Sequence, residues 1–120
     1  MGLLALGLAL LIAADLALAF LPSIGGAALG TVLWGLHMGF TQGLLARLIA
    51  DTSPPELRGT AYGFFNLLGG LATLAASVIA GELWDIGGPM GTFFAGACFA
   101  LIALAGLLAV RGKIGIKVAA

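Results

Sequence analysis

The most polar part of the chain is the stretch ADTSPPELRGTAYG, residues 50–63, which lies between two long apolar segments. Asp51, Glu56 and Arg58 all fall within it, although only 8% of the residues in the chain are charged. The Ser53-Pro54-Pro55-Glu56 sequence inside it is typical of a capping box at the start of a helix. The stretch therefore predicts a turn between two helices, with Ser53 capping the second one.

The composition around this stretch is that of a membrane protein. Hydrophobic residues make up 62% of the 120 residues, and the mean hydropathy is +1.20. A soluble domain carries about 25% charged residues. Five Lys and Arg residues balance five Asp and Glu residues, so nothing in the charge indicates a nucleic acid as partner. The single cysteine, Cys98, excludes an internal disulfide and cannot form a metal site by itself.

Four apolar segments are each long enough to cross a bilayer. A helix needs about 20 residues to span ~30 Å of hydrocarbon. None of the segments shows the alternation over ~10 residues that membrane β-strands require. The sequence therefore predicts an all-α membrane protein, a single unit of four antiparallel transmembrane helices followed by a tail at 111–120. The expected helices are residues 3–21, 27–50, 61–81 and 89–110.

The positive charges predict the orientation of these helices. Arg47 and Arg58 flank the link between the second and third segments, and Arg111, Lys113 and Lys117 follow the fourth. The other two links contain no Lys or Arg, so all five cations fall on one side of the membrane. By the positive-inside rule we expect that side, with both termini, to be cytoplasmic. The composition favours a bacterial inner membrane.

The polar link also carries a family resemblance. The pattern Asp51-x-x-Pro54-x-x-x-Arg58-Gly59-x-Ala61-x-Gly63 resembles the link between the tenth and eleventh helices of major facilitator superfamily transporters. The flanking sequences agree: GLHMGFTQGLLARLIAD is similar to a tenth helix, and GELWDIGGPMGTFFAGA is similar to the passage from the eleventh to the twelfth. The four predicted helices therefore resemble helices nine to twelve of that fold.

The resemblance implies transport of a small solute by a secondary transporter, with no cofactor. Members have about twelve helices, so the chain resembles one third of the fold, and we expect it to be inactive without the missing helices or another membrane chain. Two alternatives stay open: a complete four-helix proton-coupled exporter working as a dimer, and a non-transporting membrane subunit. Enzyme chemistry is not expected, because the sequence contains no nucleophile–base pair and no cluster of metal ligands.

The second segment contains both a small-residue stripe and polar residues. Gly35, Gly39 and Gly43 share one helix face, which suits close packing against another helix. His37 and Thr41 lie on the opposite face and are the first candidates for residues lining a substrate cavity, since the resemblance places the tenth helix at the central cavity. The alternative is a neutral His37 bonded to a neighbouring helix. Gln42 is a third candidate, with interhelical hydrogen bonding as its alternative.

The third segment has a longer stripe of small and hydroxyl residues. Its members recur every three or four residues and so share one face, which predicts close helix–helix contact. Asn66 is the member with the greatest need for a partner, and it is also a candidate for substrate contact. The stripe comprises Gly59, Gly63, Asn66, Gly70, Thr73, Ser77 and Gly81.

Asp15 is the only charged residue in the first segment, thirteenth of its nineteen residues. Placing an Asp near the centre of a membrane helix costs about 2.5–3.5 kcal/mol on insertion scales. A protonated or partnered carboxyl here is a candidate for proton coupling. The alternative is an Asp near the outer interface that is bonded to a neighbour.

Overall fold

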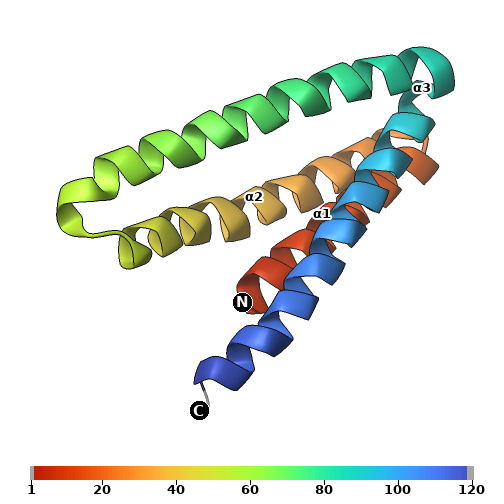
Figure 1. Ribbon diagram of the computed structural model, residues 1–120. Coiled ribbons are helices and arrows are strands. Elements are labelled where there is room, and N and C mark those ends of the chain that lie inside the picture. The colour runs from red at the N-terminus through yellow and green to blue at the C-terminus, as the bar shows by residue number, and fades with distance from the viewer. Residues whose placement is uncertain (1, 119–120) are drawn as a thin grey trace.

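The protein is all helical in a computed structural model that describes the backbone of residues 2–118 and the side chains of residues 2–113. The elements are α1 (Gly2–Phe20), α2 (Ile24–Thr52), a short 3₁₀ turn η1 (Pro55–Leu57) and α3 (Arg58–Val118). α1 and α2 pack on each other after a tight turn, α3 returns from the far end of α2 with few contacts to it, and α3 then bends back to pack on α1 (Figure 1). The all-α prediction is confirmed for the described residues.

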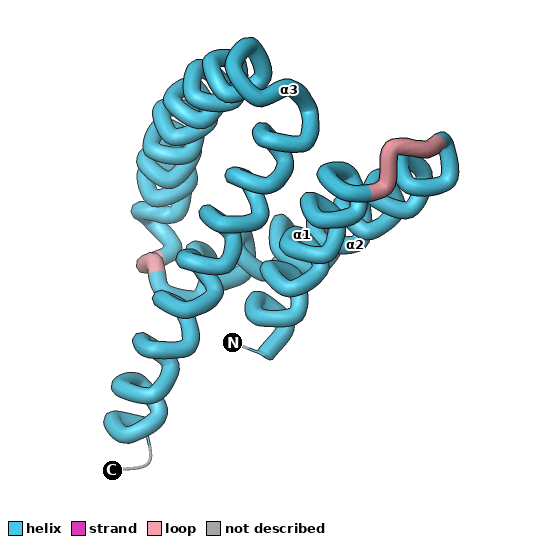
Figure 2. Tube along the Cα trace, turned by 90° about the vertical axis from the view of Figure 1, so that its right-hand side faces the viewer, coloured by secondary structure: helices cyan, strands magenta, loops and turns pink. Residues whose placement is uncertain are grey.

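The number of helices differs from the prediction. Three α-helices are present in the described chain, not four, because the third and fourth predicted helices are joined in α3. Figure 2 draws α3 as one continuous helix, but its backbone is broken at Gly88, where φ is 66° and ψ is −166°, so two helical arms meet at this residue. We call residues 58–87 the first arm of α3 and residues 89–118 the second arm.

The predicted loop at 82–88 was wrong for a simple reason. Residues 82–87 contain no proline, so nothing in them stops a helix before Gly88. Gly88 takes a positive φ that side chains rarely allow, and Pro89 then begins the second arm, where its missing N–H costs nothing. The chain therefore reverses at one residue rather than through a loop.

The capping box at the polar link is also absent. Ser53 ends α2 in an extended conformation, and no side chain caps the 3₁₀ turn that follows. Consecutive prolines explain the difference, because a residue that precedes a proline is kept out of the helical region. Ser53 and Pro54 are both held extended in this way, so the helix begins only after them.

The start of α2 has the cap that the sequence reading missed. Ser23 Oγ accepts a hydrogen bond from the Gly26 amide at 3.0 Å, which satisfies one of the free N–H groups of the first turn. The backbone of Leu21 lies so close to Gly26 that a Cβ there would collide with it. Gly26 therefore allows the tight reversal between α1 and α2.

The interior of the molecule is made of small residues. Its buried apolar side chains are Ala14, Ala17, Ala19, Ala97 and Ala100. Large apolar side chains such as Ile24, Ile86 and Leu74 are exposed instead, Ile24 by 90%. Soluble proteins rarely expose such a continuous apolar surface.

Two stretches are long and apolar enough to cross a membrane. They are Gly2–Phe20 and Pro55–Lys113, and the second contains the break at Gly88. The principal extents of the molecule are 47 × 30 × 22 Å, and the long dimension exceeds the ~30 Å of a bilayer core.

Candidate functional site

α1 lies between the two parts of the chain that pack closely on it. It contacts α2 on one side and α3 on the other, whereas α2 and α3 share few contacts. Its buried residues include Gly7, Ala14 and Asp15, so small side chains bring the neighbouring helices close. Three of the buried or half-buried polar residues, Asp15, His37 and Thr41, lie on α1 or on the part of α2 that faces it.

His37 forms a hydrogen bond between α2 and α1. Its Nδ1 lies 2.8 Å from the carbonyl oxygen of Gly7. Because a carbonyl oxygen only accepts hydrogen bonds, Nδ1 carries a proton and donates it to Gly7. The structure thus directs His37 at a neighbouring helix, in agreement with the second of the two interpretations of its sequence position.

Thr41 lies one turn further along α2 and also faces α1. Its side chain is buried, and its Oγ1 donates a hydrogen bond to the His37 carbonyl at 2.8 Å. A Cβ built on Gly7 would lie 2.5 Å from the Thr41 methyl group. Gly7 therefore lets both His37 and Thr41 approach the α1 backbone.

Asp15 occupies the opposite contact of α1, with the second arm of α3. The residue is 9% exposed, and it packs against Gly96. A Cβ on Gly96 would lie 2.9 Å from Asp15 Oδ2. A side chain at position 96 would therefore force the carboxyl group of Asp15 to shift.

The remaining cavity candidates lie apart from these contacts. Gln42 is exposed, and its Nε2 lies 3.9 Å from the sulfur of Met38 on the same helix. Asn66 is exposed on the first arm of α3. The structure does not bring either amide together with His37, Thr41 or Asp15.

The predicted packing stripes face outward in this chain. A Cβ added to any of their glycines would meet no atom within 4 Å. Thr73 Oγ1 donates to the Gly69 carbonyl on its own helix, and Ser77 is exposed. On α2 the open face is the one opposite His37 and Thr41, as the spacing predicts. The glycines concerned are Gly35, Gly39 and Gly43 on α2 and Gly59, Gly63, Gly70 and Gly81 on α3.

The polar link holds the end of α2 to the start of α3. Arg47 Nε lies 3.4 Å from Asp51 Oδ2, an exposed pair that the four-residue spacing predicts. Arg58 Nε donates to the Ala50 carbonyl at 3.1 Å, and the Tyr62 hydroxyl donates to the Ala46 carbonyl at 2.7 Å. The link is thus a structural clamp between the two helices. Its other motif residues, Pro54, Glu56, Gly59 and Gly63, are exposed.

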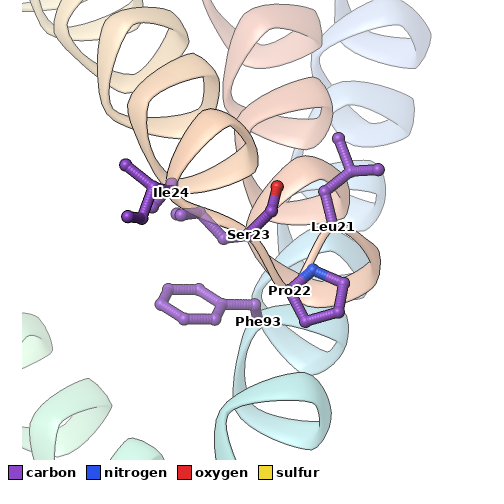
Figure 3. Close-up of a pocket in the computed structure, with 7 residues that line it drawn as sticks. Leu21, Pro22, Ser23, Ile24 and Phe93 are labelled. Carbon is purple, nitrogen blue, oxygen red and sulfur yellow. The ribbon is translucent and has the colours of Figure 1, made fainter.

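Aromatic residues gather at the end of the molecule where α1 meets α2 and where α3 bends. Phe20 and Phe94 pack edge to face with ring centres 6.0 Å apart, and Trp84 and Phe93 do the same at 6.4 Å. Phe93 faces the turn formed by Pro22, Ser23 and Ile24 (Figure 3). The groove between them has a volume of about 550 Å³ and opens to the outside, and its walls carry no charged side chain.

The sequence reading missed the glycines that shape the candidate site. Gly7 and Gly96 lie in the first and fourth apolar segments, which read as supporting Leu and Ala runs. Each one lies directly opposite a polar residue of a neighbouring helix. Nothing in the sequence alone pairs Gly96 with Asp15, because the two are 81 residues apart and meet only in the folded chain.

The described side chains offer no metal site. No group of three His, Cys, Asp or Glu residues among them is placed to hold a metal ion. Cys98 is exposed on the second arm of α3.

Comparison with known proteins identifies a transporter among the relatives. Over 70 residues, 58% of this chain, the sequence is 39% identical to the Uncharacterized MFS-type transporter MJ1317 of Methanocaldococcus jannaschii. Over 68 residues it is 32% identical to the Uncharacterized protein Mb2288 of Mycobacterium bovis and to the Uncharacterized protein Rv2265 of Mycobacterium tuberculosis. No family model and no solved structure matches the chain.

These matches cover only part of the relatives. The matched stretch is 17% of the length of each of these three proteins. The chain is therefore similar to a segment of an MFS-type transporter.

Proposed function

We propose that this chain is part of a major facilitator-type secondary transporter, and that it moves a small solute across a bacterial inner membrane only together with further helices. The observation that carries the proposal is the 39% identity to an MFS-type transporter over 70 residues. The resemblance of the link motif from Asp51 to Gly63 to the family's link also supports it. In this proposal the chain supplies the last four membrane crossings of the transporter.

The lengths of the helical segments support four crossings. α1 has 19 residues and α2 has 29, which correspond to about 28 and 44 Å at ~1.5 Å per residue. The break at Gly88 divides α3 into two arms of about 30 residues, or ~45 Å each. Every segment thus comes close to or exceeds the ~30 Å of the hydrocarbon core.

The outward face of the first arm supports the need for further helices. Every residue from 63 to 79 is exposed, and a Cβ on the glycines of this stripe would meet no atom of the described residues within 4 Å. Lipid can cover the apolar side chains, but a stripe of small residues favours a close helix. The missing helices of the transporter are the partner that the proposal assigns to this face.

The orientation can be tested with single cysteines on a Cys98→Ala background. We expect Ile86→Cys, beside the bend, to react with a membrane-impermeant maleimide in intact cells. Thr52→Cys and Gly112→Cys should react only after the membrane is opened, since the positive-inside rule places them in the cytoplasm. Reaction of positions 52 and 86 from the same side would contradict the four crossings.

The need for further helices can be tested by transport. Vesicles that contain only this chain should show no proton-driven efflux of small solutes. Efflux that is lost in Asp15→Asn would instead establish a complete small proton-coupled exporter and reject the present proposal. The two experiments are independent, because the cysteine pattern does not depend on activity.

A further inference from the structure

The first arm of α3 is tied to the rest of the molecule at its two ends. Every residue from 63 to 79 is exposed, and α2 and α3 share few contacts. At the link, the Tyr62 hydroxyl donates a hydrogen bond to the Ala46 carbonyl of α2. At the bend, Trp84 packs edge to face on Phe93 of the second arm. The second arm is held differently, because it packs on α1.

Gly88 allows the angle between the two arms to change. Its φ of 66° is the break between them, and Pro89 has no N–H to continue the helical ladder at this point. Glycine adopts positive and negative φ about equally readily, so a rotation here costs less than at a residue with a side chain. The arms on either side keep helical dihedral angles. One residue can thus act as a hinge between two rigid helices.

The hydrogen bond of Tyr62 sets which side of α2 faces the first arm. Because α3 runs back from the link, each residue forward on it matches one residue backward on α2. Ala80 and Ala28 are each 18 residues from the bonded pair, and 18 residues make five full turns at 3.6 residues per turn. These two alanines are therefore level with each other on the facing sides. Gly69 and Gly39, seven residues or nearly two turns from the bonded pair, lie on the same sides.

An apolar groove lies at the bend end of these facing sides. Four residues beyond Ala80 and Ala28, the same register places Trp84 level with Ile24. Ile24 is 90% exposed and forms one wall of the groove, and Phe93 forms another (Figure 3). Trp84 is 49% exposed and already touches Phe93. The open groove thus lies next to a large aromatic side chain that the described residues cover only in part.

We propose that the first arm of α3 is a strap that closes on α2 by rotation at Gly88, and that closure moves the Trp84 indole into the groove beside Ile24. The structure holds the open form of this strap. The inference does not rest on the proposed transport function, because both helices belong to this chain.

The groove and the facing sides can accept the closed strap. At Gly39 and Gly69 a Cβ would meet no atom within 4 Å, so no side chain stands between the two helices at this level. Ser23 Oγ lies in the wall of the groove and accepts one hydrogen bond, from the Gly26 amide. A hydroxyl oxygen has two lone pairs, so it can also accept the N–H of an indole, which usually finds a partner when it is buried.

Cysteine pairs on a Cys98→Ala background test the closure in the full chain. In phospholipid vesicles with an added oxidant, Ala28→Cys with Ala80→Cys should form a disulfide within one chain. A disulfide requires Cα atoms within about 7 Å, which only the closed strap provides at this level. The matched control is Ala28→Cys with Val78→Cys. Val78 is exposed, and it lies about 200° around the helix from Ala80, so this pair should form no disulfide.

Three results of this experiment would overturn the proposal. No disulfide between positions 28 and 80 would mean that the strap does not close. Equal yields in the two pairs would mean that the helices meet without the proposed register. A disulfide between two chains would mean that a second copy covers this side of α2.

Two adjacent glycines test the facing sides themselves. Neither Gly69 nor Gly70 has an atom within 4 Å of its Cβ position in the open form, so a large residue at either one should act alike unless the strap closes. Gly70 is turned about 100° away from Gly69. Gly69→Leu should abolish the disulfide between positions 28 and 80, whereas Gly70→Leu should retain it. Equal disulfide yields in the two variants would contradict the proposed contact.

The fluorescence of Trp84 tests its place in the groove. Trp34→Phe leaves Trp84 as the only tryptophan of the chain. In this background, formation of the disulfide between positions 28 and 80 should shift the emission to shorter wavelength, because the indole enters an apolar groove, and reduction should reverse the shift. A disulfide that forms without any shift would overturn the placement of Trp84 beside Ile24.

Discussion

α1 and the first arm of α3 are both apolar and both contain glycines, yet α1 is packed against other helices and the first arm is exposed. α1 buries Gly7, Ala14, Asp15, Ala17 and Ala19 against its neighbours. The first arm buries no residue between positions 63 and 79, and its glycines face open space. The same kind of small residue is thus a contact in one helix and an unused face in the other.

A stripe of small residues thus predicts that another helix can pack closely against it, but it does not identify that helix. Gly7 is a contact because Thr41 and His37 of α2 are held opposite to it. Gly70 has no such neighbour in the described chain. The proposed function assigns it one outside the chain. Substitutions at these glycines are therefore expected to affect stability very differently in the two regions.

The largest effect is expected at the turn that holds the packed region together. In Gly26→Ala the new Cβ collides with the backbone of Leu21, which cannot move without opening the reversal between α1 and α2. Overpacking of this kind costs about 3 kcal/mol. The free energy of unfolding, measured by titrating a denaturing detergent into mild-detergent micelles, should fall by that amount.

The adjacent glycine provides the control. The nearest atom to a Cβ on Gly25 is Ser23 Oγ at 3.9 Å, an ordinary contact. Gly25→Ala should therefore leave the unfolding curve unchanged or raise the stability by up to about 1 kcal/mol through helix propensity. Equal losses in the two variants would show that the packing around Gly26 is not the cause.

Much of this fold follows from the sequence, because helix length and apolar composition determine it. The segments predicted at 3–21 and 27–50 lie close to α1 and α2. The break between the two arms of α3 was predicted in the right region, but the loop there was wrong. A single glycine with a positive φ is enough to reverse the chain, and composition does not reveal it.

The candidate site was less predictable than the fold. His37, Thr41 and Asp15 were found because polar residues are rare in apolar segments. Their partners Gly7 and Gly96 carry no chemical signal, and the pairing depends on how distant segments cross in space. The position of α1 between α2 and α3 likewise depends on tertiary packing, which local sequence patterns do not predict.

A smaller effect is expected for the hydrogen bond between α2 and α1. His37→Leu removes the bond from Nδ1 to the Gly7 carbonyl while keeping an apolar side chain in the contact. Interhelical hydrogen bonds in membranes contribute about 0.6 kcal/mol on average and up to ~1.7. We expect a loss of about 1 kcal/mol in the same unfolding titration.

Gln42 offers a matched control for His37. It lies on the same helix, it is exposed, and its amide reaches only the sulfur of Met38. Gln42→Leu should not lower the stability of the chain. If it costs as much as His37→Leu, the loss reflects a general effect of removing polar groups from α2 rather than the bond to Gly7.

The smallest loss of unfolding free energy is expected for a substitution in the first arm of α3. Gly70→Ala adds a methyl group that meets no atom within 4 Å, so the unfolding free energy of the chain alone should not fall, and it can rise by up to about 1 kcal/mol through helix propensity. The same methyl group should weaken association with the further helices of a transporter, since it fills a face suited to close approach. A loss in the lone chain as large as that of Gly26→Ala would mean that this arm packs on the rest of the chain. The first arm would then be packed like α1, and nothing would support a helix from outside the chain as the partner of its small-residue stripe.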